Sequence, residues 1–239
     1  MSLTKEQYRN LIVRQRELND IINPEWKADR TLFDFQIAMT VEANECIEHC
    51  AYKWWKKEEV DVKQAQMEVV DCWFFYLSAM IIADYAGYAE ENMLLLSGYE
   101  PQDFDQDATI LASMRFINWV SFEIYACDTT EVTSRLWDMT KAVGLTVEQM
   151  YEMYMAKLVL NIFRQKHGYS DGTYMKVWNG IEDNEVLHEL MKRTVDLNEL
   201  DDMLETLYSA AFIKYQLQRN KNGYYKQTYN QQLIEKEIS

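Results

Sequence analysis

Glycine and proline are scarce in this sequence. Its 239 residues contain 7 glycines and 2 prolines, while 48% are hydrophobic. All-β and α/β folds need more turn residues than this to connect their strands. The composition therefore predicts an all-α helical bundle with a large core. The length is within the range of a single domain, residues 1–239, with a polar tail from about 220 to 239 that is either flexible or docks on a partner.

Basic residues are few relative to acidic ones. The sequence has 24 lysines and arginines against 39 acidic residues, a formal net charge of −15. A field of this sign repels nucleic acid and anionic membranes, so neither is expected as a partner. It also repels a phosphorylated substrate, unless bound metal ions reverse the local sign.

Cysteines are few, and none of them form a CxxC pair. The four are predicted to be reduced core thiols in a cytosol-like compartment: Cys46, Cys50, Cys72 and Cys127. The first residues do not have the pattern of a signal peptide. The longest apolar run, 73–88, is shorter than the roughly 20 residues that a membrane helix needs. We expect a helix there that is buried in the core or shared with a second subunit.

Hydrophobic periodicity and capping signals predict a chain of helices. The predicted ranges are 4–22, 32–57, 62–85, 108–127, 130–143, 146–166, 184–194 and 197–219, and a capping box of Thr146 with Gln149 opens the sixth of them. A polar stretch between 32–57 and 62–85 makes these two long helices antiparallel neighbours. Residues 98–107 are predicted to form an ordinary loop. Residues 167–185 are predicted to form a structured loop, which is a functional candidate in a helical protein.

Four acidic residues interrupt apolar parts of the two long helices. Glu42 and Glu45 are three residues apart on the first, and Glu68 and Asp71 on the second. Packed helices lie about 8–10 Å apart, so all four carboxylates can face the same gap. Burying them together is costly without cations, which predicts a site for Mg²⁺ or Mn²⁺. The alternative is a pair of solvated acidic faces, which are common in so acidic a sequence.

Other metal and catalytic sites fit the sequence less well. A di-iron carboxylate bundle needs two Glu-x-x-His motifs, and only His188, with Glu185, completes one. Histidine and cysteine do not cluster with zinc-ligand spacing. A glycine-rich phosphate loop and a nucleophile with a suitable base are also lacking.

A second polar group recurs along the helix predicted for 146–166. Lys157, Asn161 and Arg164 are spaced to share one face. An ammonium, an amide and a guanidinium there would clamp phosphate oxygens, although an exposed polar face would show the same spacing.

These patterns together resemble the dimeric all-α dUTPases. The ExxE and ExxD pairs resemble those of the all-α NTP pyrophosphatase (MazG-like) superfamily. The segment LNIFRQKHGYSDGTYMKVWNGIEDNE, 160–185, looks like the late motifs of the dimeric dUTPases. QRELND, 15–20, resembles their first motif, and AYKWWK, 51–56, resembles their Trp-Lys segment.

The resemblance implies a homodimer located in the cytoplasm. If a phage encodes the protein, this is the cytoplasm of the host cell. It implies hydrolysis of dUTP, and of dUDP, to dUMP with release of pyrophosphate or phosphate, using two or three Mg²⁺ ions per site or Mn²⁺ in their place. The implied metal ligands are Glu42, Glu45, Glu68 and Asp71. Gln15, Asn19 and Trp55 (rather than its neighbour Trp54) match positions of the base pocket; the alternatives are a solvated helix edge for the two amides and core packing for Trp55. The residues that match phosphate- and nucleotide-binding positions are Asn161, Arg164, Lys176 and Asn184, and Lys157 joins them by the spacing above.

Two questions stay open at this point. Either Glu42 or Glu45 would be the general base. Amides such as those of Gln15 and Asn19 can present a donor or an acceptor, so uracil and cytosine are both compatible with the residues. Related activities on dCTP or a broader set of nucleotides, and a non-catalytic regulatory protein with the same fold, are the alternative functions.

Overall fold

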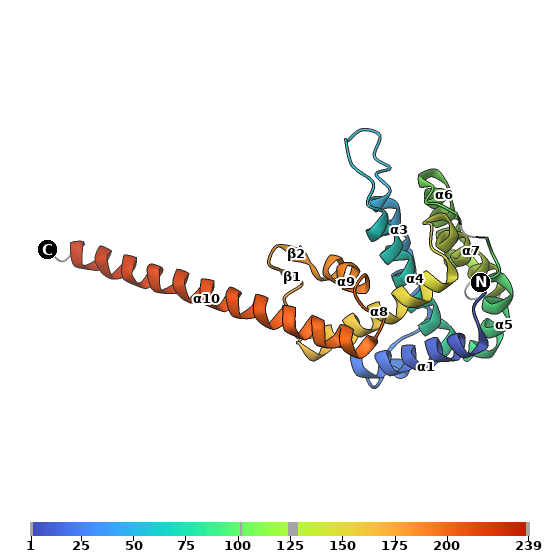
Figure 1. Ribbon diagram of the computed structural model, residues 1–239, viewed down its shortest axis with the longest axis horizontal. Coiled ribbons are helices and arrows are strands. Elements are labelled where there is room, and N and C mark those ends of the chain that lie inside the picture. The colour runs from blue at the N-terminus through green and yellow to red at the C-terminus, as the bar shows by residue number, and fades with distance from the viewer. Residues whose placement is uncertain (1, 101, 124–128, 238–239) are drawn as a thin grey trace. The chain divides into compact units, whose positions relative to one another are not determined.

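The computed structural model describes residues 2–100, 102–123 and 129–237, and within these ranges it contains ten helices and one two-stranded hairpin (Figure 1). The prediction of an all-α fold is confirmed. Cys127 lies outside the described residues. The chain divides into two compact units, Met1–Lys166 and His167–Ser239. The prediction of one domain over 1–239 stays a prediction.

The first unit contains eight helices in its described part. They are α1 Lys5–Ile22, α2 Trp26–Asp29, α3 Leu32–His49, α4 Val62–Ile82, α5 Ala86–Leu96, α6 Gln106–Glu123, α7 Thr129–Ala142 and α8 Val147–Lys166. The short α2 and the helix α5 were not predicted. The predicted capping box before α8 is confirmed, because Thr146 and Gln149 exchange side-chain-to-backbone hydrogen bonds.

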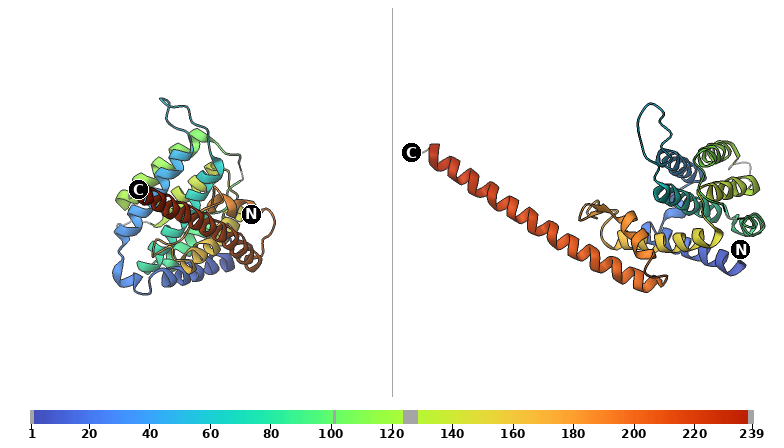
Figure 2. Two further views of the ribbon diagram at one scale, coloured as in Figure 1. Left: turned by 90° about the vertical axis from the view of Figure 1, so that its left-hand side faces the viewer. Right: turned by 45° about the horizontal axis from the view of Figure 1, so that its top comes forward.

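The helix predicted for 32–57 ends earlier, at His49. Ala51 has a left-handed backbone with a φ of 51°, which no helix can continue. The N–H of Asp61 then donates to the carbonyl of His49 at 2.9 Å and closes a loop over 50–61. Asp61 also caps α4 by accepting from the N–H of Gln64. As predicted, α3 and α4 are packed neighbours, joined by this loop (Figures 1 and 2).

Helix α4 ends at Ile82 rather than at 85, because Asp84 also adopts a positive φ, of 59°. The apolar run 73–88 is therefore divided between α4 and α5. Within the described residues, α4 has the length and composition of a membrane span, but 78% of its most apolar window is buried inside the structure. A core helix has the same properties, and the burial here agrees with that assignment.

Helix α4 lies at the centre of the first unit, where it contacts α1, α3, α5, α7 and α8. The indole ring of Trp73, on α4, packs with its centroid 4.6 Å from that of Trp137, and its N–H donates to the hydroxyl of Thr140. The prediction of reduced core thiols is confirmed for three of the four cysteines, which are free and buried: Cys46, Cys50 and Cys72. The apolar faces of α4 are thus covered by helices of the same chain.

The second unit contains a hairpin and two helices in its described part. They are β1 Val177–Trp178, β2 Ile181–Glu182, α9 Asp183–Met191 and α10 Leu197–Glu237. Asn179 and Gly180 both have positive φ, as a two-residue hairpin turn requires. Helix α10 continues well past the predicted end at 219 as one unbroken helix (Figure 2). The ring of Tyr208 on α10 stacks on that of Tyr174 in the loop before the hairpin.

Candidate functional site

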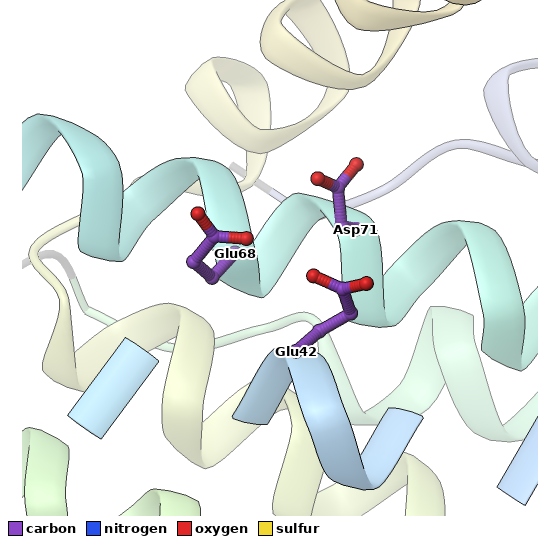
Figure 3. A group of neighbouring side chains, drawn as sticks. All are labelled: Glu42, Glu68 and Asp71. Atoms are coloured by element: carbon purple, nitrogen blue, oxygen red, sulfur yellow. The ribbon is translucent and has the colours of Figure 1, made fainter. Parts of the chain in front are cut away.

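Three carboxylates of the first unit converge between α3 and α4. Glu42 extends from α3 toward Glu68 and Asp71 on α4 (Figure 3). One oxygen of each lies within 4.8 Å of the others, a spacing that one cation can bridge. Oxygen donors of this kind suit hard divalent ions. Glu45, the fourth predicted ligand, is exposed one turn further along α3 and does not belong to this group.

The three carboxyl groups perturb one another strongly. Burial and the charges of Asp71 and Glu68 raise the pKa of Glu42 to about 9. Burial also raises the pKa of Asp71, although Lys157 opposes this. Burial acts in the same direction on Glu68, but a hydrogen bond from His49 and the charge of Lys157 hold its pKa below the ordinary value. The group therefore retains a proton at neutral pH, and a divalent cation would displace it, so the donor set fits such an ion.

Two basic side chains border the carboxylates. Lys157, on α8, is 2% exposed, and its ammonium nitrogen lies 2.9 Å from Asp71 Oδ2. The imidazole of His49, on α3, lies 3.5 Å from Glu68 Oε1, and this contact raises its pKa. Sequence reasoning did not assign a role to His49. Its position seven residues after Glu42, on the same face of the helix, was the available signal.

The predicted phosphate clamp faces the acidic group. Arg164 is buried, donates to Asn161 Oδ1 at 3.2 Å, and its charge opposes the rise that burial causes in the pKa of Asp71. Because Lys157 and Arg164 are both buried, the alternative of an exposed polar face does not hold for them. In this structure Lys157 is paired with a carboxylate.

A second polar cluster lies where α1, α4 and α8 meet. Gln15 and Asn19, which could have been the solvated edge of α1, are buried instead. Their amide nitrogens donate to Ser78 Oγ on α4 at 3.0 and 2.9 Å. Gln15 also donates to Asn19 Oδ1 at 2.9 Å, and Tyr154 on α8 donates to Gln15 Oε1. Sequence reasoning missed Ser78 and Tyr154, since a serine or tyrosine in an apolar helix carries no signal of its own.

One face of α4 connects the two clusters. Asp71 and Ser78 are seven residues apart, which places them on the same face about 10 Å along the helix axis. Phe74 lies between them in sequence, and its ring stacks on that of Tyr154 at 4.1 Å. Carboxylates, an aromatic ring and an amide cluster therefore follow one another along α4.

Aromatic side chains are exposed on the loop between α3 and α4. Trp55, the residue predicted to face a base, is 61% exposed, and its neighbour Trp54 is 89% exposed. Their rings meet edge to face at 5.5 Å. Core packing, the alternative for Trp55, is therefore excluded in this structure.

The remaining two predicted residues belong to the second unit. Lys176 is half exposed, 3.9 Å from Glu182, while Asn184 is buried at the start of α9. The loop before them is structured, as predicted. Gly168 has a φ of 84°, and a Cβ there would collide with the hydroxyl of Thr173, so this position requires glycine.

A comparison with known protein families finds a match. A family model described as dUTPase matches residues 7–169, more than half of the chain. This range contains the three carboxylates, the amide cluster and the clamp residues of α8, whereas Lys176 and Asn184 lie beyond it. A search of the curated proteins finds no match.

Proposed function

The chain belongs to the dimeric all-α dUTPase family, whose activity is that of a dUTP diphosphatase, and we propose that it hydrolyses dUTP and dUDP to dUMP with Mg²⁺. Pyrophosphate is released from the triphosphate and phosphate from the diphosphate. The observation that carries this proposal is the group formed by Glu42, Glu68 and Asp71. The proposal includes two or three Mg²⁺ ions per site, or Mn²⁺ in their place. Glu45 would complete the ligand set.

Charge explains why this group suits a nucleotide. Phosphate oxygens and three carboxylates repel one another, and the metal supplies the positive charge and Lewis acidity that let them share a site. Lys157 and Arg164 add two cations beside Asp71, where they can neutralise phosphate oxygens. Glu42 or Glu45, both on α3, accepts the proton of the attacking water.

A panel of nucleotides tests this assignment. Purified protein is incubated with dUTP, dUDP, dCTP, dTTP, dATP and UTP, with Mg²⁺ or with excess EDTA, and released pyrophosphate and phosphate are measured. We expect turnover of dUTP and dUDP with Mg²⁺ and none in EDTA. Preferred turnover of dCTP, or equal turnover of all the nucleotides, would favour the broader pyrophosphatase alternative. Loss of all turnover would favour a regulatory protein.

A homodimer is the second part of the proposal. The apolar face of α4 is covered within the chain, so it does not itself require a second subunit. A different surface supports the dimer: Phe33, Ile37 and Val41 form an exposed stripe on α3, and Leu111 and Met114 are exposed on α6, which packs beside α3. An exposed apolar area of this kind is typical of an interface. A cytoplasmic location agrees with the free buried thiols.

A further inference from the structure

The hydroxyl group of Ser78 has one proton, and its neighbours decide where that proton points. The backbone carbonyl of Phe74 lies 2.9 Å from Ser78 Oγ, whereas Asn19 Oδ1 lies at 3.4 Å. The shorter contact takes the proton. Ser78 Oγ is therefore an acceptor toward α1, and it receives one N–H from Gln15 and one from Asn19.

This polarity fixes both amides. Gln15 uses its two N–H groups on Asn19 Oδ1 and Ser78 Oγ, and its own oxygen accepts from Tyr154. Asn19 accepts through Oδ1 and donates through Nδ2 to Ser78. Flipping either amide would turn its carbonyl oxygen toward the lone pairs of Ser78 and leave buried donors without acceptors, which is costly.

Asn19 keeps some hydrogen-bonding capacity after these contacts. Within the part of the chain that the structure describes, Nδ2 donates only to Ser78, so one N–H remains, and Oδ1 retains a second lone pair. Asn19 is 9% exposed, whereas Gln15 and Ser78 are almost fully enclosed. Asn19 thus presents one donor and one acceptor, in an order set by its buried neighbours.

The position of the amide cluster along α4 indicates which part of a nucleotide would contact Asn19. The amide cluster lies about two helical turns from Asp71, with Phe74 between. A deoxynucleotide has a comparable extent from its phosphates to the far edge of its base. If its phosphates lie at the carboxylates, as the proposed function has it, its base lies near the amides.

We propose that Ser78 is a specificity-determining positioning residue: by holding the Gln15 and Asn19 amides in one orientation, it makes the site select uracil and reject cytosine. Uracil offers a donor at N3 and an acceptor at O4, and cytosine offers the reverse at both positions. A free amide can turn to suit either base, whereas a fixed one suits only one of them. This inference rests on the proposed function.

Substitution of Ser78 by alanine tests the inference. With Ser78→Ala the amides lose the acceptor that orients them and can turn toward cytosine. We expect the ratio of kcat/KM for dUTP to that for dCTP to fall by at least about tenfold, mainly because dCTP turnover rises. The ratio of dUTP to dTTP should stay unchanged, because thymine has the same N3 and O4 groups and differs only in its methyl group. Ser78→Thr, which keeps the hydroxyl, should retain the preference for dUTP.

Ser113→Ala is the matched control. Ser113 is equally buried in a helix and donates to the carbonyl four residues before it, at 2.9 Å, but it lies on α6, where it contacts Cys46. This variant should leave both substrate ratios at the wild-type values. Tyr154→Phe keeps the ring that stacks on Phe74 and removes the hydroxyl that donates to Gln15. It should lower the dUTP to dCTP ratio, and it serves if Ser78→Ala fails to fold.

The outcomes distinguish a failure of the proposed function from a failure of the role assigned to Ser78. A wild-type protein that does not hydrolyse dUTP refutes the proposed function. A wild-type protein that prefers dUTP, together with Ser78→Ala and Tyr154→Phe variants that discriminate as well as it does, refutes the role of Ser78 alone. A parallel loss of discrimination against dCTP and dTTP in Ser78→Ala also refutes it, because that result indicates a loosened pocket.

Discussion

Replacing Glu42 with glutamine should stabilise the metal-free protein while abolishing its activity. Glutamine has the shape of a protonated glutamate, and its amide N–H can still donate to Glu68. It cannot ionise and cannot supply a carboxylate to a metal ion. The variant therefore separates the effect of the clustered carboxylates on stability from their role in binding metal ions.

The magnitude follows from the pKa of Glu42, which is raised from the ordinary 4.5 to about 9. A raised carboxyl pKa contributes most stability below the unfolded value, and that contribution declines as the pH rises toward the folded value. At pH 7 the difference from the unfolded value is 2.5 pH units, and each unit is worth about 1.4 kcal/mol, so the carboxyl group costs about 3 kcal/mol relative to a non-ionising group. The same reasoning gives about 5 kcal/mol at pH 8 and less than about 1 kcal/mol at pH 5.

Urea unfolding in EDTA at pH 5, 7 and 8 measures this difference. Wild type and Glu42→Gln should have similar free energies of unfolding at pH 5, and the variant should become progressively more stable than wild type as the pH rises. Glu45→Gln is the comparison on the same helix: the side chain of Glu45 is exposed and its charge contributes least to the raised pKa of Glu42, so this variant should stay much closer to wild type than Glu42→Gln does. Adding Mg²⁺ should stabilise wild type more than Glu42→Gln. If wild type and Glu42→Gln show the same dependence of stability on pH, the account of a strained carboxylate group is wrong.

Four further results are expected. Turnover of dUTP should vanish in EDTA and return with Mg²⁺, and Asp71→Asn should lower kcat at least about a hundredfold, because it removes the charge of a metal ligand; near-wild-type activity of the variant would contradict the site. Because a C5 methyl group overfills a tight uracil pocket at a cost of about 1–3 kcal/mol, dTTP should be a poor substrate, and equal turnover of dTTP and dUTP would contradict the assignment. Hydrolysis in ¹⁸O-labelled water should label pyrophosphate and leave dUMP unlabelled, since the family resemblance implies attack at the β phosphorus; label in dUMP would show α attack. Light scattering should give about twice 28.5 kDa, and Ile37→Glu should reduce this to the monomer mass, whereas Leu95→Glu, at a position on α5 that is 76% exposed, should not.

The starts of the two long helices could be predicted because their signals are local. Leu32 and Val62 were the predicted first residues, and Thr31 and Asp61 cap them through contacts within the first turn. The end of α3 depends instead on a left-handed Ala51 and on a bond between residues twelve positions apart, which periodicity does not reveal. The hairpin was missed although Asn179 and Gly180 carried its signal in the sequence.

The candidate site divides in the same way. Acidic residues inside apolar helices identified Glu42, Glu68 and Asp71, since burying charge needs a reason. The same pattern could not distinguish Glu45, because exposure depends on how α3 is rotated against α4. Lys157 was expected on phosphate and is found on Asp71, a contact that only the packing of α8 creates.

The orientation of the amides shows most clearly what packing adds to sequence. Gln15 and Asn19 were expected near a base, but each amide alone accommodates either pyrimidine. The contacts of Ser78 remove that freedom, because a serine within a helix can return its proton to the carbonyl one turn earlier and become an acceptor for its neighbours. Asp71 and Ser78 stand on one buried helix, so the spacing between carboxylates and amides is as rigid as α4 itself. A nucleotide that binds at both groups would then be selected both by its length and by its base.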